Sequence, residues 1–233
     1  MNSFLIDKNK ASSTLGYSTR EQRMEYVWLM YNNILKGKTI LDVGSDECHL
    51  KKHLGNESTY WGIGIGGSPD QDFDLESGPL PFPDKSYDVV LCLQVLEHLE
   101  NIHFVFDELC RVSRRHVIIS LPNCLRYLWL LITKYGMETP DRLMKYYGLP
   151  LVKPEDRHRW FFDSIDAERF IRYRAELNQM KVSRLHFSNP LPKPRLRKRI
   201  FINIAMRFLF REDIDRKRLS LGSLWALLEK QER

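Results

Sequence analysis

The segment Thr39-Ile-Leu-Asp-Val-Gly44 and three apolar segments that follow it decide the fold of this chain. The other three are Tyr60-Trp-Gly-Ile-Gly-Ile65, Tyr87-Asp-Val-Val-Leu-Cys92 and His116-Val-Ile-Ile-Ser-Leu-Pro122. Each is short, rich in β-branched residues and bounded by Gly, Pro, Asp or Asn, which predicts strands rather than helices. Polar residues do not alternate along these runs, so both faces of the sheet should be covered by helices, as in parallel sheets.

A parallel sheet of this kind binds its ligand beyond the carboxyl ends of its strands, where the strand order reverses. The loops after Val43, Ile65, Cys92 and Leu121 are therefore the places where function is expected.

Several motifs of these loops follow one another in a known order. They are Leu41-Asp-Val-Gly44, Asp74-Leu-Glu76, Leu80-Pro-Phe-Pro-Asp84 leading into Ser86-Tyr-Asp-Val-Val90, Gln94-Val-Leu-Glu-His-Leu99, Arg111-Val-Ser113 and Leu121-Pro-Asn123. With them the chain resembles the class I S-adenosylmethionine-dependent methyltransferases, in particular the methyltransferase type 11-like branch whose fourth strand ends in Leu-Glu-His. The resemblance implies an α/β fold, a Rossmann-like, doubly wound, mostly parallel seven-stranded sheet with helices on both faces, and S-adenosyl-L-methionine as cofactor.

Composition places the chain among ordinary globular proteins. It has 233 residues, of which 43% are hydrophobic and 28% charged, which is enough for one domain with additions. The amino terminus does not read as a secretory signal, and no apolar run is long enough to span a bilayer. The four cysteines show no paired spacing, which argues for a reducing compartment and against a zinc site. A cytoplasmic protein without a bound metal is expected.

The chain divides into an arm and one decorated domain. Residues 1–17 are polar and without pattern, which predicts a flexible arm, and residues 18–233 form the methyltransferase-like domain. Ser18 and Glu21 predict a capping box before a helix that ends at Gly37. Further helices are expected over residues 47–54, 102–112 and 165–178, with closing strands over residues 181–188 and 224–228. Residues 124–162 resemble a lid-like insertion, and residues 193–218 a basic amphipathic insertion before the last strand.

The first loop would approach the amino-acid end of the cofactor. The resemblance assigns this role to Asp42, Val43, Gly44 and Ser45, with Gly44 allowing a sharp turn and close backbone approach. Asp42 could contact the ligand amine through water, or could only cap the turn.

Two positions depart from the family pattern. Ser45-Asp-Glu-Cys48 stands where most relatives have two further glycines, and Gly64 stands where an acidic residue usually accepts hydrogen bonds from the ribose hydroxyls. Without that carboxylate, affinity should fall by one to two orders of magnitude, because a hydrogen bond to a charged group contributes roughly 1.5–3 kcal/mol. Asp70 or Asp46 could substitute, or the cofactor site could be degenerate.

The resemblance assigns the rest of the cofactor site to three strand ends. Gly64 and Ile65 follow the second strand. Asp74 would accept from the adenine amino group and Leu75 would offer an amide, although Asp74 could equally be a solvated loop acid. The pocket under the methionine chain would be lined by Gln94, Val95 and Leu96.

Two histidines are candidate general bases. His98 has a side chain that titrates near neutrality, which suits removal of a proton from a hydroxyl nucleophile. Methyl transfer needs mainly positioning, so His98 could also be a packed, hydrogen-bonded residue. His158, in Asp156-Arg-His-Arg-Trp160, could face an acidic or sugar substrate from the lid, or could belong to a solvated surface.

The net charge of +6 is concentrated in one segment. Residues 193–218 contain ten Lys or Arg and three Asp or Glu, a local balance of +7, so the remainder of the chain sums to −1. Arg199, Asn203, Arg207 and Arg211 recur on one side of a helical pattern with Phe201 and Phe208 on the other. Such a helix could lie on an anionic membrane surface or pack on its own domain. Nothing resembles a nucleic-acid recognition module, which argues against nucleic acid as a partner.

These observations predict methyl transfer to a small-molecule substrate, a saccharide or lipid-linked sugar hydroxyl, by a cytoplasmic and peripherally membrane-associated enzyme. The alternative is a non-catalytic methyltransferase-like binding or scaffold protein with a degenerate cofactor site. The sequence leaves the acceptor atom and the oligomeric state open.

Overall fold

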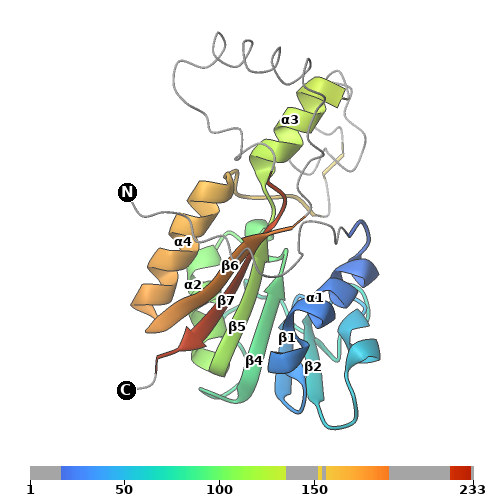
Figure 1. Cartoon of the computed structure of the whole chain (residues 1–233), viewed down its shortest axis with the longest axis vertical. Helices are drawn as coiled ribbons and strands as arrows, with labels where there is room; N and C mark the ends of the chain where they lie inside the picture. Colours follow the sequence, from blue (N-terminus) through green and yellow to red (C-terminus); the bar gives the residue numbers. More distant parts are fainter. Residues whose placement is uncertain (1–16, 135–151, 154–155, 189–220, 232–233) are drawn as a thin grey trace.

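A seven-stranded sheet forms the centre of the molecule, with strand order β3-β2-β1-β4-β5-β7-β6 (Figure 1). The computed structural model describes residues 17–134, 152–153, 156–188 and 221–231. The strands are β1 (Thr39–Val43), β2 (Thr59–Gly64), β3 (Gln71–Asp72), β4 (Tyr87–Leu93), β5 (Ser113–Leu121), β6 (Met180–Phe187) and β7 (Leu224–Lys230). Strand β7 runs antiparallel to β5 and β6, and the other described strand pairs are parallel. The predicted doubly wound, mostly parallel sheet is confirmed.

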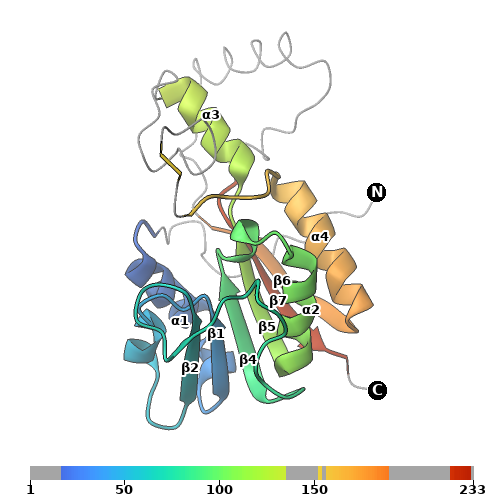
Figure 2. The same ribbon diagram turned by 180° about the vertical axis from the view of Figure 1, so that it is seen from behind.

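Helices cover both faces of the sheet (Figure 2). Helix α1 (Arg20–Leu35) lies on one face with the 3₁₀ helix η1 (His49–His53), and α2 (Ile102–Val112) and α4 (Ser164–Leu177) lie on the other. A second 3₁₀ helix, η2 (Leu96–His98), follows β4, and α3 (Cys124–Lys134) extends beyond the carboxyl end of β5 (Figure 1). The strand order reverses between β1 and β4, so the ligand-binding crevice is expected there.

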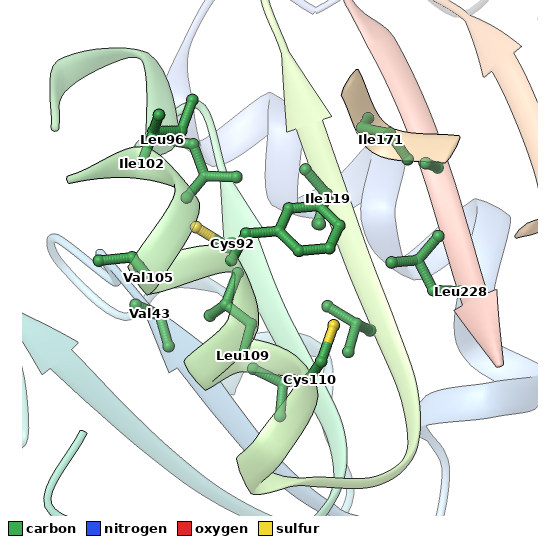
Figure 3. Packing of buried hydrophobic residues seen from close by; sticks show 14 of the residues in the cluster. Val43, Cys92, Leu96, Ile102, Val105, Leu109, Cys110, Ile119, Ile171 and Leu228 are labelled. Atoms are coloured by element: carbon green, nitrogen blue, oxygen red, sulfur yellow. The ribbon is translucent and has the colours of Figure 1, made fainter. Parts of the chain in front are cut away.

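Strands β1, β4, β5 and β7 contribute side chains to two cores, which explains their continuous apolar sequences. Val90 and Cys92 of β4 pack toward α2 and α4, whereas Val89 and Leu91 pack toward α1. Figure 3 shows the first core, with Val105 and Leu109 of α2, Ile171 of α4 and Leu228 of β7 around Cys92 and Ile119. Burying these side chains contributes about 25 cal/mol per Å² of apolar area.

Two local predictions were wrong. The helix expected over residues 47–54 is only the short η1, because Asp46 and Cys48 adopt left-handed backbone angles, with φ of 52° and 51°. The capping box before α1 uses Thr19 and Gln22 rather than Ser18 and Glu21. The Thr19 hydroxyl accepts from the Gln22 amide at 3.2 Å, and the Gln22 side chain accepts from the Thr19 amide at 3.4 Å.

The predicted arm and insertions are described only in part. Tyr17, placed in the arm, packs edge-on against the buried Trp225 with ring centroids 6.0 Å apart, so this residue belongs to the core. Residues 1–16, most of the lid-like insertion and the whole basic segment of residues 193–218 lie outside the described residues. Within the described ranges, no helix is both long enough and apolar enough to cross a bilayer.

Candidate active site

A cavity of about 620 Å³ opens at the carboxyl ends of β1, β2 and β4. This is the crevice at which the strand order reverses. Nine of the residues proposed from the sequence line it, namely Gly44, Ser45, Gly64, Ile65, Asp74, Leu75, Gln94, Val95 and His98. Its size is within the range of small-molecule and cofactor sites.

The floor of the cavity is made by two backbones in close approach. Gly44 has a φ of +79°, and its amide donates to the Ile63 carbonyl at 2.7 Å. A Cβ at Gly44 would lie 2.3 Å from a methyl group of Val95, and one at Gly64 would lie 3.3 Å from the Cα of Gly44. The absence of side chains at these two positions allows the two backbones to approach each other and a ligand closely.

Asp42, Val43 and Leu96, also proposed from the sequence, are buried and do not line this cavity. The hydroxyl of Tyr60 donates to Asp42 at 2.7 Å, which ties β1 to β2 just below the loop. Burial raises the pKa of Asp42 to about 6, against the opposing effect of this hydrogen bond. The geometry favours the orienting role of Asp42 over contact with a ligand.

Gly64 stands where relatives have an acidic residue that binds the ribose. The two acids considered as its substitutes, Asp70 and Asp46, have different surroundings. Asp70 does not line the cavity, since its carboxylate accepts from the Gly62 amide at 2.8 Å and binds Lys51 at 2.5 Å. Asp46 does line the cavity and forms an ion pair of 2.5 Å with Arg20. Of the two substitutes considered, only Asp46 lines the cavity.

Asp74 occupies the far side of the same cavity. Its Oδ1 accepts from the amide of Glu76 at 2.9 Å, so the carboxylate organises its own loop. The side chain is exposed at the cavity, whereas the neighbouring Leu75 is buried against the core. This position is compatible with both roles predicted for Asp74, that of a solvated loop acid and that of a contact to the ligand.

Two arginines of α1 face the cavity and were missed from the sequence. Arg20 and Arg23 are three residues apart at the start of the helix and therefore share one face. Arg23 donates to the Leu93 carbonyl at 3.2 Å, while its buried Nε makes no hydrogen bond within the described part of the chain. Their three-residue spacing at the start of the predicted helix is the only signal in the sequence that could have identified them.

A second cavity of about 310 Å³ adjoins the first and shares Arg20, Arg23 and Gln94 with it. Gln94 has a φ of 61°, and its side chain donates to the Ser223 hydroxyl at 3.0 Å. The remaining lining is largely polar or cationic and comprises Tyr17, Ser18, Thr19, Asn123, Arg126, Tyr127, Leu130, Gly222 and Ser223. No described residue in this lining is acidic, so the cavity offers a positive environment.

The structure brings the two candidate bases together. The rings of His98 and His158 lie with centroids 4.4 Å apart. His98 lines the larger cavity, whereas His158 is not among its lining residues. His98 also pairs through Nδ1 with Asp156 at 2.5 Å, and Glu97 is buried beside it.

Comparisons with known proteins agree with this geometry. A family profile described as a methyltransferase domain matches residues 61–121. The sterol 24-C-methyltransferase of Pneumocystis carinii is 21% identical over 156 residues, which are 58% of this chain and 39% of that protein. This chain thus spans about two fifths of the length of that curated relative.

Solved structures share the fold at low sequence identity. A methyltransferase dependent on S-adenosylmethionine from Archaeoglobus fulgidus has a TM-score of 0.56 and 16% identity, covering 91% of this chain and 95% of its own. The magnesium protoporphyrin IX methyltransferase of Synechocystis, with bound S-adenosylhomocysteine, has a TM-score of 0.52 and 17% identity, covering 91% and 83%. The [4+2]-cyclase SpnF has a TM-score of 0.53 and 12% identity, covering 91% and 82%.

Proposed function

We propose that this chain is a class I S-adenosylmethionine-dependent methyltransferase and that it transfers the methyl group of that cofactor to a small-molecule acceptor. The observation that carries the proposal is the 620 Å³ cavity, because the loops after β1, β2 and β4 meet there over the Gly44 and Gly64 backbones.

The residues of the cavity fit most of the cofactor. Arg23 lines the cavity together with Gly44 and Leu93, and its buried Nε has no hydrogen-bond partner among the described residues, which suits the carboxylate of the methionine part. Asp74 and Leu75 suit the adenine end, and Asp46 is the acid nearest the missing ribose partner. When bound, the cofactor supplies an electrophilic methyl group on a sulfonium ion. The protein then has to position the acceptor, exclude water and receive a proton.

The second cavity is where we place the acceptor. It meets the cofactor cavity at Arg23 and Gln94 and is lined mainly by arginines, hydroxyls and amides. Such a lining suits a polar or anionic molecule, and we propose a saccharide or lipid-linked sugar hydroxyl, in particular of an acidic sugar. His98, at the edge of the larger cavity, would take the proton.

Calorimetric titration with S-adenosylmethionine and S-adenosylhomocysteine tests the proposal. We expect one site per chain with a Kd in the high micromolar range, because one ribose partner is missing while the other contacts remain. Absence of binding at millimolar cofactor would overturn the enzymatic function.

A non-catalytic binding or scaffold protein is the second candidate function. The observation that favours it is the loop at Asp46 and Cys48, where left-handed backbone angles occur at residues other than glycine. The cyclase among the structural relatives also shows that this fold accommodates other reactions. Cofactor binding without methylation of any acidic or neutral saccharide acceptor would support this function.

We also propose that the basic segment of residues 193–218 associates with an anionic membrane surface. Its local balance of +7 supports the proposal, since each basic residue near such a surface contributes about 1 kcal/mol. A lipid-linked acceptor would then be presented at the same surface.

A further inference from the structure

Glu97, His98 and His158 form a compact group beside the cofactor cavity. One potential ligand atom from each lies within 4.8 Å of the others. We propose that these three side chains bind a divalent transition-metal cation. The cysteine spacing had predicted no zinc site, and this group contains no cysteine.

Glu97 is the strongest indication. Its side chain is 1% exposed, and neither carboxylate oxygen has a hydrogen-bond partner among the described residues. A buried carboxylate without partners is costly, so such groups are normally paired, protonated or coordinated to metal. Burial raises the pKa of Glu97 to about 7, with His98 opposing the shift. A cation between Glu97 and the histidines would supply the missing partner.

His98 is oriented as a metal ligand usually is. Its Nδ1 lies 2.5 Å from Oδ1 of Asp156, and its Nε2 lies 3.9 Å from Oε1 of Glu97. Histidines that bind metals commonly donate their other ring N–H to a carboxylate, which fixes the tautomer and the ring orientation. Asp156 therefore has the position of a supporting carboxylate, and Nε2 of His98 points toward the proposed cation.

The third ligand is held in place by main-chain contacts. His158 belongs to a short segment whose next residue, Arg159, donates its amide to the Glu97 carbonyl at 2.8 Å. The indole of Trp160 donates to the Leu99 carbonyl at 2.7 Å. These two bonds fix the segment against η2, so the ring of His158 stays edge-on to that of His98, with an interplanar angle of 73°.

The donor set indicates the class of cation. Two imidazole nitrogens and one carboxylate suit Zn²⁺, Co²⁺, Fe²⁺ or Mn²⁺, whereas Ca²⁺ and Mg²⁺ prefer oxygen ligands. Ligand atoms around a tetrahedral zinc ion lie roughly 3.3 Å apart. The present separation of up to 4.8 Å therefore requires small side-chain rotations on binding.

Three protein ligands leave a coordination position for another molecule, as in catalytic zinc sites. His98 lines the cofactor cavity, so this position would be directed there. With the cation bound, His98 could not take the acceptor's proton as it would in the metal-free protein, but a metal-bound acceptor hydroxyl would lose that proton to solvent more readily. This role depends on the proposed methyl transfer, whereas metal binding itself does not.

Titration of tag-free, chelator-treated protein with Co²⁺ tests the site, followed by competition with Zn²⁺, each without S-adenosylmethionine. We expect one equivalent per chain and visible absorption bands of a nitrogen- and oxygen-coordinated Co²⁺. Glu97→Gln and His158→Gln should each weaken binding at least a hundredfold, and Asp156→Asn about tenfold. His53→Gln, a histidine outside the group, should bind as the wild type does.

Thermal unfolding of each variant separates loss of the site from loss of the fold. If Glu97→Gln does not fold, the affinity of His158→Gln for Co²⁺ tests the site. His158 is only partly buried, so its replacement should leave the fold intact. Wild-type protein that binds no Co²⁺ at 100-fold excess, or unchanged affinity in the folded Glu97→Gln or His158→Gln variant, would overturn the proposal. The metal titrations contain no cofactor, so a failure to bind metal would not count against the methyltransferase proposal. That proposal is tested separately by titration with S-adenosylmethionine.

Discussion

Gly44 and Val95 meet across the carboxyl ends of β1 and β4, so closely that a Cβ on Gly44 would lie 2.3 Å from a methyl group of Val95. The two residues belong to different motifs of the sequence and are both part of the cavity lining. Their contact sets how near the backbone of the first loop comes to a ligand.

Gly44→Ala should therefore destabilise the protein more than a positive φ alone would. The left-handed conformation costs about 1–2 kcal/mol for a residue with a Cβ, and the contact with the stiff Val95 side chain adds to it. Gly66→Ala is the matched control, since Gly66 has a φ of 77° with nothing within 4 Å of its Cβ position. Equal loss of stability in urea unfolding of the two variants would contradict the steric argument.

Arg23→Gln should weaken cofactor binding by roughly ten- to hundredfold, the effect of losing one charge-assisted hydrogen bond. The cofactor end near Leu93 would lose its cationic partner. Calorimetry measures the change, and Arg172→Gln on the exposed side of α4 serves as control. An unchanged Kd would show that the methionine carboxylate is held elsewhere.

Asp74→Ala should weaken binding more than tenfold while leaving the fold intact, because an exposed loop acid contributes little to the core. The measurement is the same titration, combined with a thermal unfolding curve. Titration of both proteins with S-adenosylmethionine and with methionine alone shows which part of the cofactor Asp74 contacts. If Asp74 contacts adenine, methionine should bind equally well to both proteins.

Asp42→Asn should remove a pH dependence of stability. The pKa of Asp42 is raised from 3.8 to about 6 in the folded state. The contribution of Asp42 to the free energy of unfolding is therefore fully present below pH 3.8 and is lost as the pH rises through 6. The difference of about two units corresponds to about 3 kcal/mol.

Unfolding free energies measured between pH 4 and 7 should fall less steeply in Asp42→Asn than in the wild type. The amide oxygen of asparagine can still accept from Tyr60. Asp72→Asn, at an exposed position of β3, should retain the wild-type slope. Identical slopes for all three proteins would mean that Asp42 titrates normally.

Replacement of Arg199, Arg207 and Arg211 together by Gln should weaken binding to vesicles of phosphatidylserine and phosphatidylcholine, with cofactor affinity unchanged. Wild-type binding should fall steeply with salt, because the attraction is screened over about 10 Å at 0.1 M ionic strength. Sedimentation with vesicles provides the measurement. A wild-type protein that ignores anionic vesicles at low salt would exclude the membrane proposal.

Local sequence pattern determined the fold and the edge of the sheet that carries the site. Four β-branched apolar runs, bounded by Gly, Pro, Asp or Asn, were sufficient because burial on both faces leaves few alternatives for such segments. Helices α2 and α4 and strands β6 and β7 followed from their periodicity, close to the expected bounds. The residues at the ends of β1, β2 and β4 were foreseeable because parallel strands bring their carboxyl ends together.

Tertiary structure alone decided which side chains meet at that edge. Arg23 reaches the cavity because α1 packs across β4, and His158 joins His98 because a segment distant in sequence docks on η2. Such contacts depend on how helices and loops pack, which periodicity does not encode. The sequence determined which edge of the sheet carries the cavity, whereas packing determined the charges and donors that line it.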